Sequence, residues 1–133
     1  MSQFLPNCLP LLIGSLPLDN HKEATELIFD YTPSIPLWPQ LPQYKEEGMI
    51  LQYVPGLPGV AQCEGKVYLD TGGASFDEEL LAFYEDYLMV SEGGGSIDDS
   101  RFPLSKEVAQ GFYTFLEKSA EVKDNLVGLK GQT

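Results

Sequence analysis

The sequence predicts an α/β fold in which parallel strands alternate with helices. Two short apolar runs, near residues 9–15 and 125–131, have the continuous hydrophobicity of strands that are buried on both faces of a parallel sheet. Three segments, near residues 20–31, 76–90 and 106–119, repeat apolar residues at helical spacing. This alternation of strand-like and helix-like segments is typical of α/β domains.

The opening residues predict a strand, a turn and a helix. The strand Leu9–Ile13 ends at Gly14-Ser15. Asp19 or Asn20 can cap the following helix, because either side chain can accept a hydrogen bond from a free backbone N–H. Pro33 ends this helix, since the residue before a proline avoids the helical conformation.

A proline-rich stretch, PSIPLWPQLPQY over residues 33–44, follows the first helix. Four prolines remove backbone donors, so we expect only a short strand, at Ile35, Leu37 and Trp38, before the loop at Pro39. Residues 44–53 then predict a helix, because the following side chains fall on one side of it: Met49, Ile50 and Tyr53.

The middle of the chain predicts a hairpin and a long helix. Residues 60–70 form two strand-like runs around Glu64-Gly65, a tight-turn pair. Ser75 and Glu78 have the spacing of a capping box. The apolar stripe of the helix is expected to be a core face; it comprises Phe76, Leu80, Phe83, Tyr84, Tyr87 and Leu88. Ser105 can cap the third helix.

Composition excludes several classes of function. The 133 residues suit one domain, and 43% of them are hydrophobic, which is typical of a folded chain. The net charge of −12 repels phosphate backbones and anionic membranes, so we expect no nucleic-acid or membrane partner. The sequence has no apolar run of about 20 residues and no signal-peptide pattern, and we expect a cytoplasmic protein.

Metal and thiol chemistry have little support in the sequence. Cys8 and Cys63 are expected to be buried free thiols, and His21 a solvated residue in the first turn of its helix. A zinc site needs about four ligands at close spacing, which these three residues do not offer. The Asp98-Asp99 doublet is weak evidence for a metal site.

Gly14-Ser15 is the most suggestive pair, because sites in α/β folds lie beyond the carboxyl ends of the strands. Glycine lets a ligand approach the backbone closely, and serine adds a hydroxyl beside backbone N–H groups. The pair therefore suits a carboxylate or a phosphate. A plain strand-to-helix turn is the alternative, and the pattern alone favours it.

Four segments in chain order resemble a known family: LIGSLP, IPLWPQLP, EGMILQYVPGLPGV and LVGLKGQ. They are similar to the amino-terminal part of the catalytic domain of cobalamin-independent methionine synthase. They are more closely similar to the single-barrel relatives grouped with uroporphyrinogen decarboxylase. The resemblance implies the amino-terminal portion of a (β/α)8 TIM barrel, with its first three or so β/α units in residues 1–133 and an inserted β-hairpin.

The resemblance also implies a substrate and a set of site residues. In that family, the segment that matches Ile13, Gly14 and Ser15 holds the amino-acid part of homocysteine. Trp38, Gln40 and Met49 are weaker pocket candidates, and Trp38 and Met49 are at least as easily read as plain core residues. The family's acidic residue that grips the substrate amine has no clear match, since Gln40 and Gln43 lie nearer in spacing than Glu46 or Glu47.

The implied activity is methyl transfer to homocysteine or a related thiol, with a methylated folate or a corrinoid as the donor. The family's zinc ligands match positions beyond Thr133, so no catalytic residue and no metal ligand is expected in this chain. A complete barrel takes roughly 200–250 residues. We therefore expect a segment that either self-associates or pairs with a missing carboxyl-terminal half, because open sheet edges need cover.

Two other functions remain open. One is a decarboxylase-like or corrinoid-linked barrel enzyme with another substrate. The other is a non-catalytic interaction module that keeps the front of the barrel.

Overall fold

The structure is a computed structural model that describes residues 5 and 7–131. The chain divides into two compact units, which we call the first unit (residues 1–48 and 109–133) and the second unit (residues 49–108). The described residues form three α-helices and a two-stranded sheet, joined by short 3-10 turns. The mixed α/β composition predicted from the sequence is therefore confirmed.

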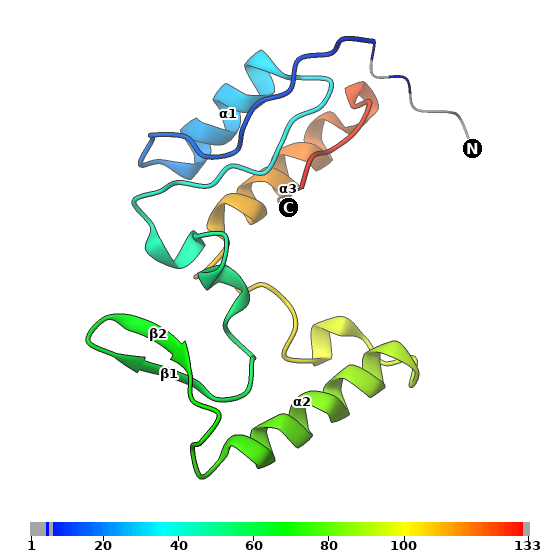
Figure 1. The fold of residues 1–133 in the computed structure, drawn as a ribbon. Coiled ribbons are helices and arrows are strands. Elements are labelled where there is room, and N and C mark those ends of the chain that lie inside the picture. Colours follow the sequence, from blue (N-terminus) through cyan, green and yellow to red (C-terminus); the bar gives the residue numbers. More distant parts are fainter. Residues whose placement is uncertain (1–4, 6, 132–133) are drawn as a thin grey trace. The chain divides into compact units, whose positions relative to one another are not determined.

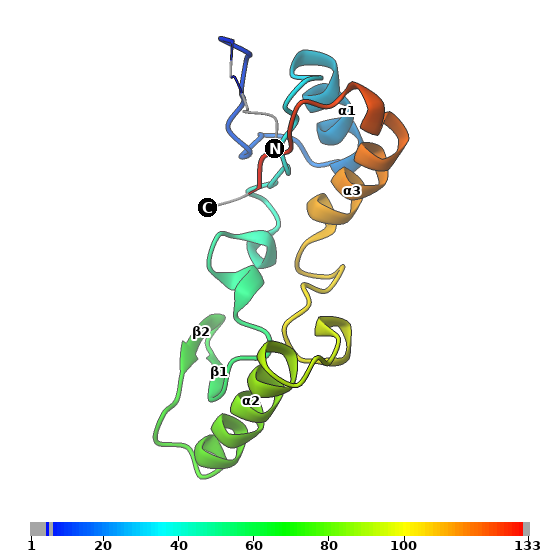
Figure 2. The same cartoon turned by 90° about the vertical axis from the view of Figure 1, so that its right-hand side faces the viewer.

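Two helices of the first unit, α1 (His21–Tyr31) and α3 (Gln110–Val122), lie side by side (Figures 1 and 2). The helix predicted near residues 20–31 is confirmed, and Asn20 is its cap, since its side chain accepts a hydrogen bond from the Glu23 N–H at 3.1 Å. The third predicted helix begins later than expected, after Ala109 rather than at Ser105. The carboxylate of Glu47 accepts the hydrogen bond from the Gln110 N–H at this end, so no serine cap is needed there.

The core of the first unit lies between these helices and the proline-rich segment. Phe29 of α1 contacts Phe115 of α3, with ring centroids 5.9 Å apart. The rings of Trp38 and Phe112 pack at a tilt of 45°, with centroids 4.7 Å apart. The buried apolar side chains of this core are Ala24, Ile28, Phe29, Leu37, Trp38, Leu41, Ala109 and Phe115.

Three extended segments of the first unit run parallel. Ser15 forms a parallel bridge with Gln40, and Leu37 forms one with Lys130, so residues 36–40 pair with each of the other two segments. Four backbone hydrogen bonds hold them, from the N–H groups of residues 16, 38, 40 and 130, at 2.7–3.1 Å. We call residues 14–16, 36–40 and 128–130 the three parallel segments.

The prediction of full strands at residues 9–15 and 125–131 was wrong. Each stretch contributes one bridge instead of a ladder, because Pro36 and Pro39 remove donors from the middle segment. The first stretch is also not buried on both faces, since Leu11 and Ile13 are 53% and 82% exposed.

The predicted helix over residues 44–53 was also wrong. Two 3-10 turns replace it, Lys45–Glu47 and Leu51–Tyr53. Gly48 lies between them with an extended backbone (φ −61°, ψ 152°), which interrupts the helical path. Met49, Ile50 and Tyr53 are consequently exposed.

The second unit contains the predicted hairpin. Strands β1 (Val60–Cys63) and β2 (Lys66–Leu69) pair antiparallel, with Val60 opposite Leu69. Glu64 and Gly65 both have positive φ, 50° and 75°, as a type I′ turn requires. The turn signal in the sequence therefore set the register of the hairpin.

Helix α2 (Phe76–Ser91) confirms the second predicted helix but corrects two details. The capping box does not form, because the Ser75 hydroxyl donates to Glu79 Oε1 at 2.7 Å. Glu79 Oε2 in turn accepts from the Gly59 N–H at 2.8 Å, which ties the helix to the hairpin. The apolar stripe is not a core face, since no residue of α2 is buried and Tyr84 and Tyr87 are more than half exposed.

Carboxylates that accept hydrogen bonds make the second unit sensitive to acid. Arg101 Nε donates to Asp86 Oδ2 at 2.7 Å, and this bond lowers the pKa of Asp86. The Gly59 N–H, followed by the Ser75 hydroxyl, lowers the pKa of Glu79. Because a lowered folded-state pKa stabilises only the ionised form, this contribution is present above the ordinary pKa and is lost as the pH falls through the folded value.

We therefore expect the Asp86→Asn variant to lose less stability than the wild type between about pH 5 and pH 2. Hydrogen exchange of the α2 amides, measured across this range, checks the prediction. The matched control is Glu85→Gln, at the exposed neighbouring position. If Asp86→Asn loses as much stability on acidification as the wild type and Glu85→Gln do, the prediction is wrong.

Candidate functional site

The predicted strand-end site is partly assembled in the first unit. The Gln40 N–H donates to the Gly14 carbonyl at 2.7 Å, and the Leu16 N–H donates to the Gln40 carbonyl at 3.1 Å. These bonds place Ser15 directly beside Gln40. The structure thus brings together three of the six predicted site residues: Gly14, Ser15 and Gln40.

The side-chain amide of Gln40 includes a donor, Nε2, that lacks a hydrogen-bond partner within the described residues. Gln40 is 8% exposed. A buried amide donor normally has a partner, because an unmade hydrogen bond costs roughly 1–3 kcal/mol. Ser15 is exposed and carries a hydroxyl. Each of these two groups is a donor of the kind that suits a carboxylate.

The other predicted site residues lie elsewhere or serve packing. Trp38 is buried against Phe112, as expected of a core residue. Ile13 is 82% exposed. Met49 is 66% exposed and belongs to the second unit, so the structure does not place it with Ser15.

The two cysteines correct another expectation, since Cys8 and Cys63 are both exposed free thiols and not buried ones. Cys8 lies ahead of the three parallel segments, and Cys63 ends the exposed strand β1. Within residues 5 and 7–131, no three His, Cys, Asp or Glu side chains form a group that could hold a metal ion. The resemblance matches the family's zinc ligands to positions beyond Thr133, and we derive no step through a metal.

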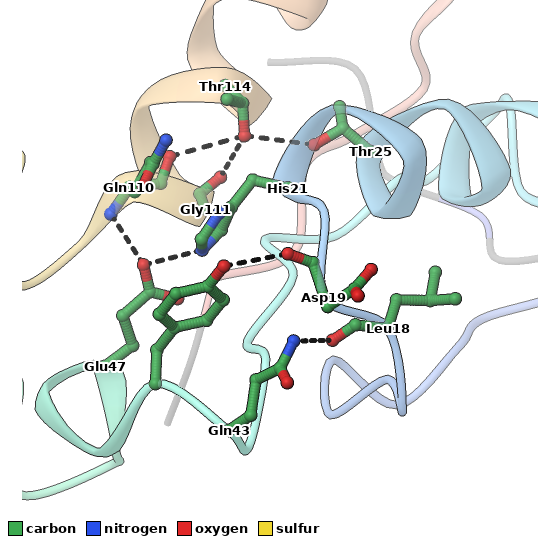
Figure 3. A network of polar contacts seen from close by, with 10 residues as sticks. Leu18, Asp19, His21, Thr25, Gln43, Glu47, Gln110, Gly111 and Thr114 are labelled. Carbon is green, nitrogen blue, oxygen red and sulfur yellow. Dashed lines mark hydrogen bonds and ion pairs between the residues drawn. The ribbon is translucent and has the colours of Figure 1, made fainter.

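A buried polar network that the sequence did not predict lies at the start of α1 and α3 (Figure 3). His21 and Glu47 are 5% and 4% exposed, and His21 Nε2 lies 2.7 Å from Glu47 Oε1. The contact has the distance of an ion pair without the alignment of a hydrogen bond. The same carboxylate oxygen accepts from the Gln110 N–H at 3.1 Å. One side chain thus links the first turns of two helices.

Neighbouring groups complete this network. The ring of Tyr44 packs 4.7 Å from the ring of His21, and its hydroxyl donates to the Asp19 carbonyl at 2.8 Å. Across the helix pair, the hydroxyls of Thr25 and Thr114 lie 3.1 Å apart. Figure 3 shows His21 and Thr25 on α1, Gln110 and Thr114 on α3, and Glu47 reaching His21 and Gln110 from the 3-10 turn at residues 45–47.

The contacts of this network are typical of a structural role, since they link α1 to α3. An open hollow of about 390 Å³ adjoins it, lined by Asp19, Asn20, His21, Lys22, Tyr44, Gln110 and Thr114. His21 and Glu47 are nevertheless buried and occupied with each other. The prediction that His21 is solvated was wrong. Its partner Glu47 lies 26 positions further along the chain, and a local sequence pattern carries no signal for such a contact.

Comparison with known proteins adds no family to this description. The sequence matches no protein-family model, no curated protein and no solved structure. Within the described part of the chain, none of the helices has the length and apolar character that a bilayer crossing requires.

Proposed function

We propose that this chain is the opening part of a barrel methyltransferase, and that it holds the amino-acid portion of homocysteine or a related thiol substrate at Ser15. The observation that carries the proposal is the order of the three parallel segments. Residues 14–16, 36–40 and 128–130 are neighbours in chain order, and the middle one bonds to both of the others.

The helices fit this order. Helix α1 connects the first segment to the second, and α3 precedes the third. Parallel strands that follow one another with a helix between them are the repeating unit of a (β/α)8 barrel. The second unit enters the sequence between the second segment and α3, at a loop where barrels accept insertions. This arrangement supports the family resemblance of the sequence.

The chemistry at the segment ends supports the substrate class. Barrel active sites lie beyond the carboxyl ends of the strands, where Ser15 and Gln40 are found. The Ser15 hydroxyl and Gln40 Nε2, which has no hydrogen-bond partner among the described residues, are neutral donors of the kind that bind a carboxylate. The role of this chain is therefore binding and orientation, and thiol activation is assigned to residues outside it.

The outer parallel segments support the expectation of further pairing. Apolar side chains on these segments or just before them are half exposed or more: Leu11, Ile13, Val127 and Leu129. Exposed apolar residues beside unpaired backbone groups favour pairing with another strand. We propose that further barrel strands, or a second copy of the chain, cover these edges.

The test is a Ser15→Ala substitution in the complete barrel. Loss of one hydrogen bond to a charged group is worth roughly 1.5–3 kcal/mol, so homocysteine affinity should fall about ten- to a hundredfold. Stability should change little, because Ser15 is exposed. Calorimetric titration and a thermal melt measure the two effects.

Ser105→Ala provides the control, because it removes a comparable exposed hydroxyl from the second unit. It should leave homocysteine affinity unchanged. If Ser15→Ala instead melts earlier while binding homocysteine as tightly as the wild type, the pair Gly14-Ser15 is a plain turn and the proposed substrate role is wrong.

A further inference from the structure

Helix α2 presents three apolar side chains to solvent, which we call the outer seam. Leu81, Tyr84 and Leu88 are 62%, 54% and 49% exposed. Their spacing of three and then four residues places them on one face of the helix, because an α-helix has about 3.6 residues per turn. Apolar residues at this spacing form the contact line along which one helix packs on another. Residues 49–108, all of which the structure describes, contain no second α-helix that could cover the outer seam.

A row of carboxylates follows one flank of the outer seam. Glu78 and Glu85 are exposed and lie seven residues apart, and Glu92, the cap of the helix, continues the same interval. Seven residues make about two turns, so the three side chains share one edge of the helix. Glu85 directly follows Tyr84, which puts the row at the flanking position of a helix pair, where charges select the partner.

The carboxylates on the inward side of α2 are used differently. Asp86 binds the Arg101 guanidinium at 2.7 Å, and Glu79 accepts from the Gly59 N–H at 2.8 Å, so both hold the second unit together. None of the ion pairs between described residues involves the outward row at 78, 85 and 92. The outward carboxylates are therefore available to a partner.

The charge of the row decides which partner fits. A second copy of the chain would bring the same row and a net charge of −12, and antiparallel packing of two α2 helices would set the glutamates against each other. A helix with the opposite charge has no such penalty, and its lysine or arginine side chains would lie opposite the row.

We propose that the outer seam docks an amphipathic helix of another protein, which presents an apolar stripe flanked by lysine or arginine. Helices commonly bind through apolar residues at this spacing, and flanking charges fix their partner and orientation. The inference does not rest on the proposed methyltransferase function, because every residue involved belongs to the second unit.

The probe is a synthetic helix of about three heptads, with leucine at the seam positions and lysine at both flanking positions. Lysine on both flanks keeps the peptide from pairing with itself. We expect the whole chain to bind it with a Kd of about 0.1 mM, and the α2 amide signals to shift in two-dimensional NMR. The same peptide with glutamate in place of lysine should bind at least about tenfold more weakly.

Substitutions at exposed positions separate the two parts of the surface. Glu85→Lys should weaken binding of the lysine peptide about tenfold and strengthen binding of the glutamate peptide. Leu81→Ala should weaken binding of both peptides, because it removes apolar contact area. Glu64→Lys makes the same change of charge in the hairpin turn and should bind the lysine peptide like the wild type at about 0.15 M salt.

Four results would overturn the proposal. The first is the absence of α2 shifts with the lysine peptide up to about ten times the expected Kd. The second is equal binding of the two peptides by the wild type, and the third is wild-type binding of the lysine peptide by Glu85→Lys. The fourth is a dimer of the chain alone that Leu81→Ala dissociates, since a second copy would then cover the outer seam.

Discussion

Replacing Glu47 by alanine should lower the free energy of unfolding of the first unit by about 1–3 kcal/mol, the usual cost of leaving a buried polar group without its partner. The substitution leaves His21 buried without its partner and removes the acceptor of the Gln110 N–H. It also removes a negative charge from the start of α3, where the helix dipole favours one. Three favourable contacts disappear with one carboxylate.

The single tryptophan of the chain makes this measurement specific to the first unit. Trp38 is buried against Phe112, so its fluorescence during urea unfolding follows the core between α1 and α3. The neighbouring Glu46 is exposed, and Glu46→Ala should change stability by no more than about 0.5 kcal/mol. Equal stability of the two variants would mean that Glu47 does not hold the two helices.

Replacing Gly111 by alanine should destabilise the first unit by about 1–3 kcal/mol, the range for overpacking. A Cβ on Gly111 would collide with the carbonyl oxygen of Pro39, a backbone atom that cannot swing aside. Alanine favours a helix over glycine by about 1 kcal/mol, which offsets only part of the collision. Helix α3 is thus expected to need glycine where it crosses the middle parallel segment.

Gly128→Ala is the matched control, because a Cβ there meets nothing within 4 Å. It should leave stability within about 0.5 kcal/mol of the wild type. Both variants are compared by urea unfolding with Trp38 fluorescence. If Gly111→Ala is as stable as Gly128→Ala, the close packing of α3 on the Pro39 carbonyl in the structure is wrong.

Local sequence signals predicted the elements that depend on local physics. Helices α1 and α2 were found from their apolar spacing, and Asn20 was one of two predicted caps. The hairpin followed from Glu64-Gly65, because a two-residue turn with positive φ fixes its register. These elements need only a few neighbouring residues to form.

Elements that depend on distant contacts were predicted less well. The start of α3 is set by Glu47, which lies 63 positions before Gln110, and the sequence around Ser105 gave no sign of this. The apolar stripe of α2 has the pattern of a core face, yet Tyr84 and Tyr87 are exposed. An amphipathic pattern shows that a face can be buried and does not show what covers it.

The residues of the candidate site likewise fall into those that a local pattern predicted and those that depend on distant contacts. Gly14 and Ser15 were singled out by pattern, and the structure places Ser15 beside Gln40. The buried contact of His21 with Glu47 was not predicted from the sequence, because burial of a polar side chain depends on the whole fold.

The central claim is that residues 14–16, 36–40 and 128–130 form consecutive parallel neighbours, as at the start of a barrel. Scalar couplings across hydrogen bonds, measured by NMR, test it most directly. We expect couplings from the Gln40 N–H to the Gly14 carbonyl and from the Trp38 N–H to the Lys130 carbonyl. The absence of both couplings, or close Hα–Hα contacts of an antiparallel pair between these segments, would contradict the claim.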